Sequence, residues 1–208
     1  MRNILVLCLA LFVLIIFTPA EAQMYKGTET ASYTVERTLE GAELRSYGPR
    51  LVAEVTVAGS RSGAANAGFR ILAGYIFGGN AESSKIAMTT PVAQVPQASA
   101  GSAAAKTGAG GAQSWTVRFS LPAGRSLADL PPPDDPRIRL METAPERMLV
   151  LQFSGRPTDA ALAKATASLR AIADRAGVKG QGEPEFMFYD SPFTLPWNRR
   201  NEVALVLD

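Results

Sequence analysis

The chain has 208 residues, with 21 lysines and arginines against 19 aspartates and glutamates, no histidine and a single cysteine, Cys8. A net charge of +2 is not the concentrated positive charge of a nucleic-acid-binding surface, so no nucleic acid is expected among the partners. Without histidine a Ser-His-Asp centre cannot form, and neither a Gly-x-Ser-x-Gly elbow nor an acid–base pair of carboxyl groups is recognisable. We therefore expect no catalytic residues, no metal ligands and no enzymatic activity.

The N-terminus has the features of an export signal. Residues 4–17 form an unbroken apolar run, and Ala20-Glu21-Ala22 is a small-x-small cleavage site. The run is shorter than the roughly 20 residues that cross a bilayer, and Cys8 lies inside it rather than at its end, where a lipid-anchor cysteine would lie. We expect residues 1–22 to be removed and a single domain, residues 23–208, to be periplasmic or secreted, without a membrane span.

Nine segments show the alternation and the flanking turn residues that are typical of strands, and two show helical patterning. The predicted strands span residues 33–36, 42–47, 51–57, 85–92, 115–121, 138–143, 147–153, 185–189 and 202–207. One predicted helix spans 62–77 and is closed by Gly78-Gly79. The other spans 158–176, with Thr158 as its N-cap and Gly177 beyond its end.

One long segment has the composition of a loop. Residues 96–114 consist mostly of alanine, glycine and serine, with no large apolar side chain that would anchor them. This composition predicts a flexible surface loop between paired strands. A lid over a ligand is the alternative.

Two parts of the chain repeat the same order of features. Residues 49–59 and 145–155 each contain a turn, a strand and a glycine before a helix, with the proline ten positions before the glycine. The segment 89–92 (Thr-Thr-Pro-Val) also matches 190–193 (Asp-Ser-Pro-Phe) in kind. We infer a duplicated domain with one helix and about four strands in each half.

Two short motifs resemble those of a known family. The octapeptide 85–92 (Lys-Ile-Ala-Met-Thr-Thr-Pro-Val) and the closing run 199–203 (Arg-Arg-Asn-Glu-Val) resemble the Met-Thr-x-Pro-Val and Arg-Arg-Asn-Glu segments of the SOUL haem-binding family. The resemblance extends from about Tyr33 to Leu207. It implies an α+β fold in which the duplicated halves form an antiparallel, barrel-like sheet of about 8–9 strands with two helices.

The two predicted helices differ in their apolar surface. The second has one apolar stripe opposed by charged residues, as expected of a helix that packs on a sheet and faces water. The first is apolar on several sides, and Arg70 is almost its only charge. Such a helix is either buried, under the N-terminal segment or the long loop, or lines an apolar groove.

The resemblance favours the groove, because it implies that haem is held along this first helix. The candidate ligand-binding residues lie on the helix, in the octapeptide and in an aromatic loop before the last strand: Phe69, Arg70, Ala73, Tyr75, Ile76, Met88, Phe193, Leu195 and Trp197. The loop residues would either pack over a ligand or plug the groove.

Several candidates have a second interpretation. Arg70 is placed to pair with a propionate, or it is an exposed arginine without a partner. Met88 and Tyr75 are unusual ligands for iron, or they are respectively a core side chain and an aromatic residue with its hydroxyl in water. Arg199 and Arg200 bind an anion, or they bond carbonyl groups and Glu202.

These observations predict a monomeric protein that sequesters or transports haem or a related porphyrin without transforming it. The ligand would not be required for folding. Three alternatives keep the same fold: a module that binds another small amphipathic effector, as in the effector-binding domains of certain transcriptional regulators; a tetrapyrrole-modifying enzyme; and a protein-interaction module whose groove is filled.

Overall fold

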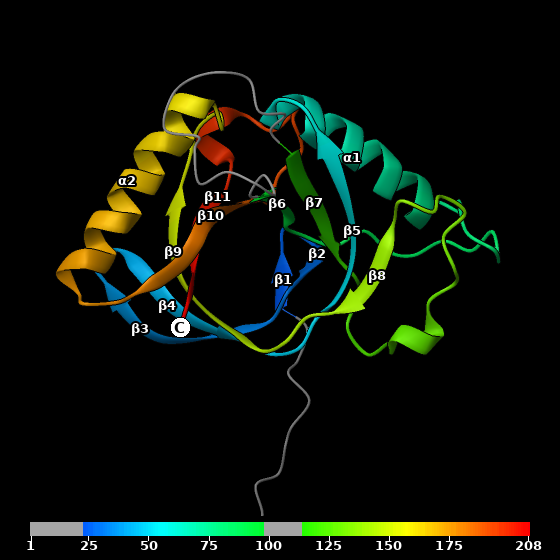
Figure 1. Cartoon of the computed structure of the whole chain (residues 1–208), viewed down its shortest axis with the longest axis horizontal. Helices are drawn as coiled ribbons and strands as arrows, with labels where there is room; N and C mark the ends of the chain where they lie inside the picture. Colours follow the sequence, from blue (N-terminus) through cyan, green and yellow to red (C-terminus); the bar gives the residue numbers. More distant parts are fainter. Residues whose placement is uncertain (1–22, 98–113) are drawn as a thin grey trace, which may run out of the picture.

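The computed structural model of the protein describes residues 23–97 and 114–208. The predicted signal, and all but the ends of the predicted loop, lie outside these residues. Helices α1 (Arg61–Ile76) and α2 (Asp159–Arg175) accompany a nine-stranded sheet (Figure 1), which confirms the predicted α+β class. The strands of this sheet are β3 (Tyr33–Leu39), β4 (Ala42–Tyr47), β5 (Leu51–Ala58), β6 (Val92–Gln97), β7 (Ser114–Ser120), β8 (Arg139–Glu142), β9 (Glu146–Phe153), β10 (Gly180–Phe188) and β11 (Asn201–Leu207).

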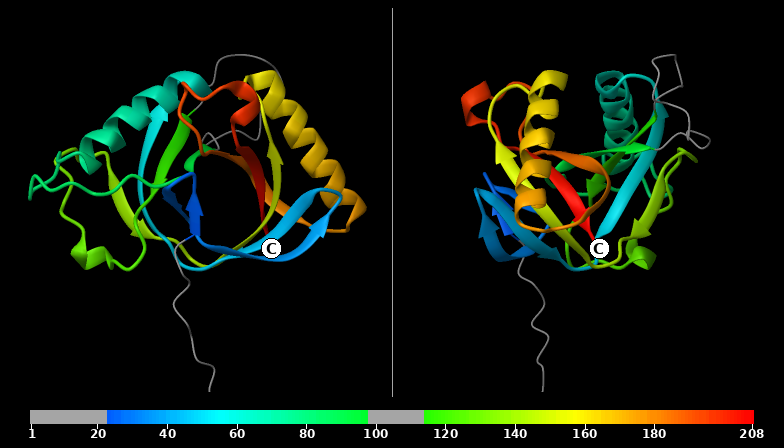
Figure 2. Two further views of the ribbon diagram at one scale, coloured as in Figure 1. Left: turned by 180° about the vertical axis from the view of Figure 1, so that it is seen from behind. Right: turned by 60° about the vertical axis from the view of Figure 1, so that its left-hand side comes forward.

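The sheet is antiparallel and curved but open. Its order is β3-β4-β9-β11-β10-β6-β7-β5-β8, so β3 and β8 are edge strands and no barrel closes. The predicted barrel-like sheet is therefore barrel-like in its curvature but not closed. Both helices lie on the outer face of the curve, and a separate hairpin, β1 (Gln23–Tyr25) and β2 (Thr28–Thr30), lies against the inner side (Figures 1 and 2).

The strand order has a symmetry that a duplication would produce. On one side of the β10–β6 pair the strand order outward is β10, β11, β9, and on the other side it is β6, β7, β5. Each half therefore contributes the strand before its helix and the two strands after it, arranged as mirror images about this pair. Gly59 and Gly155 precede the two helices, and both have positive φ, +123° and +103°, a conformation that glycine adopts without a steric penalty. The duplication itself remains an inference from the sequence.

One of the sequence comparisons between the halves needs correction. Residues 89–92 and 190–193 do not occupy equivalent places, because the first segment precedes β6 whereas the second follows β10. The two segments are similar in composition, but Pro91 leads into strand β6, whereas Pro192 belongs to the connection that follows β10.

The octapeptide is also not a strand along its length. Residues 85–89 have no regular structure, the Thr90–Pro91 peptide bond is cis, and the strand runs from Val92 to Gln97. The reason is visible in the hydrogen bonds. The Ile86 N–H donates to the Ile76 carbonyl at the end of α1 (2.9 Å), so the segment follows the helix end before it reaches the sheet.

The helices pack on the sheet through small and aliphatic residues. The buried face of α1 contains Gly68, where an added Cβ would lie 2.5 Å from Val117 Cγ2, so the helix backbone approaches β7 closely. The buried stripe of α2 includes Leu162, Leu169 and Ile172, as its sequence pattern predicts. Within the described residues, no helix is long and apolar enough to cross a membrane.

Candidate functional site

The outward side of α1 carries apolar rings and one cation. Phe69 is 41% exposed, and Phe77, just past the helix end, is 64% exposed. At about 100° per residue, Phe69, Ala73, Phe77 and Arg70 fall within an arc of roughly 100°. Arg70 is exposed and makes no hydrogen bond or ion pair with any residue that the structure describes. The stripe therefore offers apolar surface beside a free guanidinium.

This stripe continues onto the sheet between the two helices. The Phe69 ring meets the Phe119 ring edge to face, with centroids 5.3 Å apart. Phe119 pairs with Val92, which pairs with Phe188 on β10. Directly paired residues lie on the same face of a sheet, and Val92 and Phe188 are only partly buried. Phe119 is buried beneath the Phe69 ring, whereas Val92 and Phe188 leave part of their apolar surface exposed.

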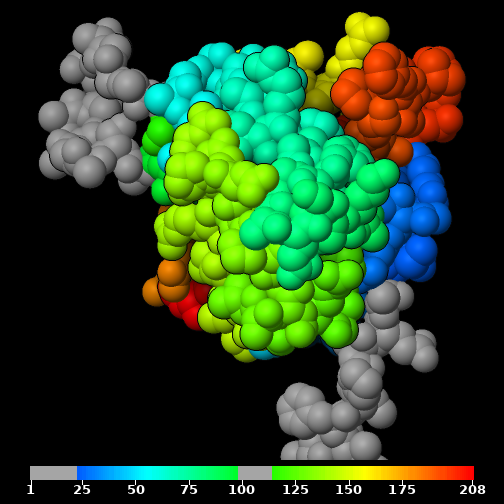
Figure 3. Space-filling model, turned by 90° about the vertical axis from the view of Figure 1, so that its right-hand side faces the viewer, coloured from blue at the N-terminus to red at the C-terminus, as the bar shows by residue number. Residues whose placement is uncertain are grey.

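The loop that follows Phe188 adds three exposed apolar side chains. Phe193, Leu195 and Trp197 are 96%, 53% and 69% exposed, so they do not plug a groove. Figure 3 looks at the side of the molecule that carries α1, and the segment around the short helix η2 (Pro196–Asn198), in orange-red, protrudes beside that helix. An exposed apolar patch of this kind typically marks a binding surface.

Hydrogen bonds hold this loop in a defined shape. The Arg199 side chain donates from Nε to the Thr194 carbonyl (2.7 Å) and from Nη2 to the Pro192 carbonyl. The Pro196 carbonyl accepts from the Gly155 N–H (2.9 Å). The exposure of the three apolar side chains therefore belongs to an anchored loop.

Other predicted site residues face inward. Tyr75 and Ile76 are each 1% exposed and pack in the core beneath α1. The Tyr75 hydroxyl donates to the Pro131 carbonyl (3.1 Å) in the interior, so the expectation that it lies in water is wrong. Met88 packs against the same core. The helix geometry is the cause, since the positions of Tyr75 and Ile76 fall on the arc that meets the sheet.

The closing motif has structural roles. Arg199 bonds carbonyl groups, as described, and Arg200 donates to Glu202 Oε1 from Nε (2.9 Å) and Nη2 (2.6 Å). The Asn201 side chain donates to the Gly155 carbonyl (3.0 Å). These contacts confirm the structural interpretation of the arginine pair.

Glu202 lies at the centre of a buried cluster on the inner face of the sheet. Its carboxylate accepts from Arg45 Nη1 (3.0 Å) and Nη2 (3.1 Å) and from the Tyr189 hydroxyl (2.8 Å). Burial opposes the charge of Arg45, but Glu202 outweighs it, so the pKa of Arg45 is raised. Burial raises the pKa of Tyr47 to about 12. Arg45 and Tyr47 therefore keep their protons at neutral pH, which suits a structural cluster.

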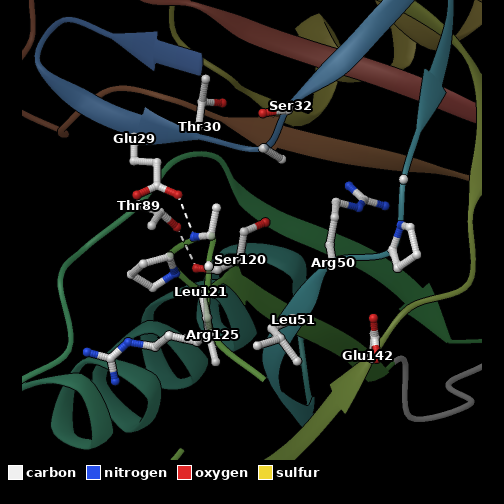
Figure 4. Close-up of a pocket in the computed structure, with 16 residues that line it drawn as sticks. Glu29, Thr30, Ser32, Arg50, Leu51, Thr89, Ser120, Leu121, Arg125 and Glu142 are labelled. Carbon is white, nitrogen blue, oxygen red and sulfur yellow. Dashed lines mark hydrogen bonds between the residues drawn. The ribbon is translucent and has the colours of Figure 1, made fainter. Parts of the chain in front are cut away.

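A cavity of about 530 Å³ lies at the rim of the sheet, between the β1–β2 hairpin, β5 and the chain after β7 (Figure 4). The octapeptide builds one of its walls. The Thr90 N–H donates to the Glu29 carbonyl (2.8 Å), and Thr89 lines the cavity while its hydroxyl donates to the Ser120 carbonyl (2.5 Å). None of the nine predicted site residues lines this cavity.

The family assignment follows from the sequence match. Residues 28–206 match the family described as SOUL heme-binding protein. The chain belongs to the SOUL family. No match was found among curated proteins.

Solved structures share the fold of this SOUL protein at low sequence identity. A hydrolase from Listeria innocua has 11% identity and a TM-score of 0.53, over 83% of this chain and 94% of the other. The EcmrR C-terminal domain has 11% identity and a TM-score of 0.55, over 85% and 98%. An uncharacterized conserved protein from Listeria innocua has 13% identity and a TM-score of 0.54, over 77% and 89%. At these identities the likeness concerns the fold alone.

For this SOUL protein, the sequence identified Phe69, Arg70, Ala73 and the aromatic loop, which the structure places at the surface. Phe77 was not among the predicted site residues, although an aromatic side chain at the end of an apolar helix could have indicated that it belongs to the site. The sequence also missed the rim cavity, because five segments distant in sequence contribute to it: 29–32, 48–51, 89, 120–125 and 142. Within the described residues, no group of three or more acidic or cysteine side chains is arranged to hold a metal ion.

Proposed function

We propose that this SOUL protein binds a planar, amphipathic tetrapyrrole, haem or a related porphyrin, along the outer side of α1 and does not transform it. The observation that carries the proposal is the exposed apolar stripe of Phe69, Ala73 and Phe77 beside the unpaired Arg70. Such a surface suits a flat ring with propionate groups, because the ring buries apolar area and the guanidinium pairs with a carboxylate. The aromatic loop supplies a second apolar contact.

The residues present fit the macrocycle better than they fit the iron. The sequence has no histidine, the Tyr75 hydroxyl is engaged in the interior, and Met88 and Met187 belong to packed cores. Apolar burial and the propionate contact would therefore supply most of the affinity. A role in sequestration or transport follows, since no described constellation of side chains suggests a reaction on the ring.

The family supports tetrapyrrole binding in general terms, and the site on α1 is the more specific proposal. A hydrolase among the proteins of similar fold does not argue for hydrolysis here, because the likeness extends to the fold alone. Binding of another amphipathic effector on the same stripe is the outcome that a failed haem titration would favour.

The direct test is a titration of the purified protein with haemin, followed by the absorbance of the bound pigment. No histidine tag is used, because a tag would supply the iron ligand that the chain lacks. We expect saturation at one haem per monomer, with quenching of the fluorescence of the exposed Trp197. A linear, unsaturated rise would contradict the proposal.

We also propose that the protein acts outside the cytoplasm as a monomer. The proposal rests on the apolar run at 4–17 and the small-x-small site that follows it. N-terminal sequencing of protein recovered from the periplasm or the medium should begin near Gln23. A sequence that begins at Met1 would contradict this proposal.

A further inference from the structure

The aromatic loop, residues 189–200 between β10 and β11, forms an apolar tip at the surface of the protein. Phe193, Leu195 and Trp197 each leave more than half of their surface exposed. The segment around η2 stands out from the helices beside it (Figures 2 and 3). Apolar side chains that are exposed together in this way typically mark a surface that another body covers.

The backbone of this tip has few polar groups left to pair. Five of the seven carbonyls in residues 192–198 accept a hydrogen bond, namely those of Pro192, Thr194, Leu195, Pro196 and Asn198. The two prolines also have no N–H to satisfy. A loop that stays in water does not need internal partners, because water supplies them. A loop that enters the apolar part of a bilayer does need them, since lipid tails form no hydrogen bonds.

Positive charge gathers at the base of the loop. Lys26 reaches it from the β1–β2 hairpin, and its Nζ donates to the Asn198 carbonyl (2.7 Å). Arg156 is exposed and follows directly on the glycine whose N–H binds η2. The only acid of the loop, Asp190, pairs with Lys26 (2.6 Å), so Arg156 and Arg199 have no acidic partner among the described residues. The base of the tip therefore complements an anionic surface.

We propose that the aromatic loop docks this protein on the surface of a lipid bilayer that contains anionic lipids. Phe193 and Leu195 enter the apolar edge of the bilayer, and Trp197 lies at the interface with water, where indole rings are enriched. The cations at the base of the loop lie near the lipid phosphates. The docked protein is peripheral, because only surface side chains enter the lipid.

A bilayer fits this tip better than a second protein does. A stable protein interface buries roughly 800 Å² on each partner, and an aromatic side chain supplies about 150–250 Å². Two rings and one leucine fall short of that area. A bilayer needs no partner of complementary shape, and a projecting tip enters it more readily than a flat surface would.

The proposal goes beyond the tetrapyrrole site, because it concerns the protein without a ligand. Haemin titration without vesicles tests the one, and vesicle binding without haemin tests the other. Either can therefore fail while the other holds.

The test mixes the purified, ligand-free protein, with the N-terminus that its own cell leaves on it, with vesicles of phosphatidylcholine that contain about 30% phosphatidylglycerol. We expect the protein to sediment with these vesicles and the fluorescence of Trp197 to shift to shorter wavelength as the indole leaves water. The other tryptophan, Trp115, is only 5% exposed and should contribute no shift. Vesicles of phosphatidylcholine alone should bind about three- to tenfold more weakly, because they carry no net charge.

Leu195→Asn and Leu127→Asn are a matched pair of variants. The two leucines are 53% and 46% exposed, but Leu127 lies in the short helix η1 (Leu127–Asp129), away from the loop (Figures 1 and 2). Leu195→Asn should weaken vesicle binding about tenfold, because it removes apolar surface that the bilayer would bury. Leu127→Asn should leave vesicle binding unchanged, and circular dichroism checks that both variants fold.

Arg156→Gln tests the contribution of charge. It should weaken binding to the anionic vesicles about three- to fivefold and leave binding to phosphatidylcholine unchanged. An equal loss on both kinds of vesicle would contradict the charge complementarity.

Three results would overturn the proposal as a whole. One is the absence of sedimentation with either kind of vesicle. Another is an equal loss in Leu195→Asn and Leu127→Asn, since the loop would then have no special part. The third is a dimer that forms without vesicles and that Phe193→Asn dissociates, because the tip would then belong to an interface with a second copy of the chain.

Discussion

The two faces of the sheet differ in whether their charged side chains are paired and whether their apolar side chains are buried. The inner face buries charges and pairs them, as in the cluster of Arg45, Arg200 and Glu202. The outer face carries the helices and, along α1, leaves the Phe69 and Phe77 rings in water beside the unpaired Arg70. A paired charge in the interior stabilises one structure, whereas partly exposed rings and an unpaired cation at the surface are available to a ligand. Under the proposed function, the inner face contributes stability and the outer face binds the ligand.

The largest effect should come from breaking the inner cluster. Glu202→Ala would leave the buried Arg45 without its bidentate partner, and removal of one member of a buried pair destabilises a protein by about 3–5 kcal/mol. Urea unfolding measures this loss. Glu36→Ala, which breaks an exposed pair with Arg147, is the control and should change the midpoint little; equal effects would contradict the distinction between the two kinds of pair.

A charge on the outer stripe should impair binding rather than folding. Phe69→Asp would place a carboxylate against the apolar ring of the ligand, so haemin affinity should fall tenfold or more. Absorbance titration measures the affinity, and circular dichroism checks the fold. The control is Ala167→Asp at an exposed position of α2. If both variants bind equally, the ligand does not lie on α1.

A third change replaces the buried carboxyl group of Glu185 on the inner face. Burial raises the pKa of Glu185, although Arg118 and Arg50 oppose the rise. Because the folded pKa lies above the unfolded one, the folded state holds more protons between the two values, and stability falls as pH rises through that interval. Glu185→Gln should remove this dependence and stabilise the protein by roughly 1–2 kcal/mol at pH 7.

Unfolding by urea at several pH values above 4.5 tests this prediction. Glu183→Gln, two residues earlier on the same strand and largely exposed, should leave the pH dependence unchanged. A steeper dependence in Glu185→Gln would show that the carboxylate is stabilising when ionised.

The smallest effect should come from the cation on the outer stripe. Arg70→Ala removes an exposed partner for a propionate, so affinity should fall by up to about fivefold. The loss should shrink as salt is added, because screening weakens an exposed ion pair. A loss that does not depend on salt would indicate that Arg70 contributes packing instead of charge.

Much of the fold was predictable from the sequence because it depends on local patterns. The alternation in 42–47 and the apolar stripe of α2 match β4 and the buried residues of that helix. The octapeptide was wrongly predicted to be a strand along its whole length. Its path depends on hydrogen bonds to the Ile76 carbonyl and the Glu29 carbonyl, contacts that no local pattern encodes.

The candidate site was predictable only in part, for a related reason. Hydrophobicity identified α1 as unusual, but the side of the helix that meets the sheet decides which residues are available. Tyr75 and Ile76 were therefore included with Phe69 and Arg70 although they face the core. The rim cavity depends on Thr30, Arg50 and Leu121 meeting in space, which the sequence does not reveal.

The most direct test of the account compares haem with iron-free protoporphyrin IX on the untagged protein. If the outer stripe holds the macrocycle through apolar burial and a propionate contact, the two dissociation constants should agree within about threefold, because the iron adds little. A preference for haem of roughly thirtyfold or more would contradict the account. It would require an axial ligand that the described residues around α1 do not offer.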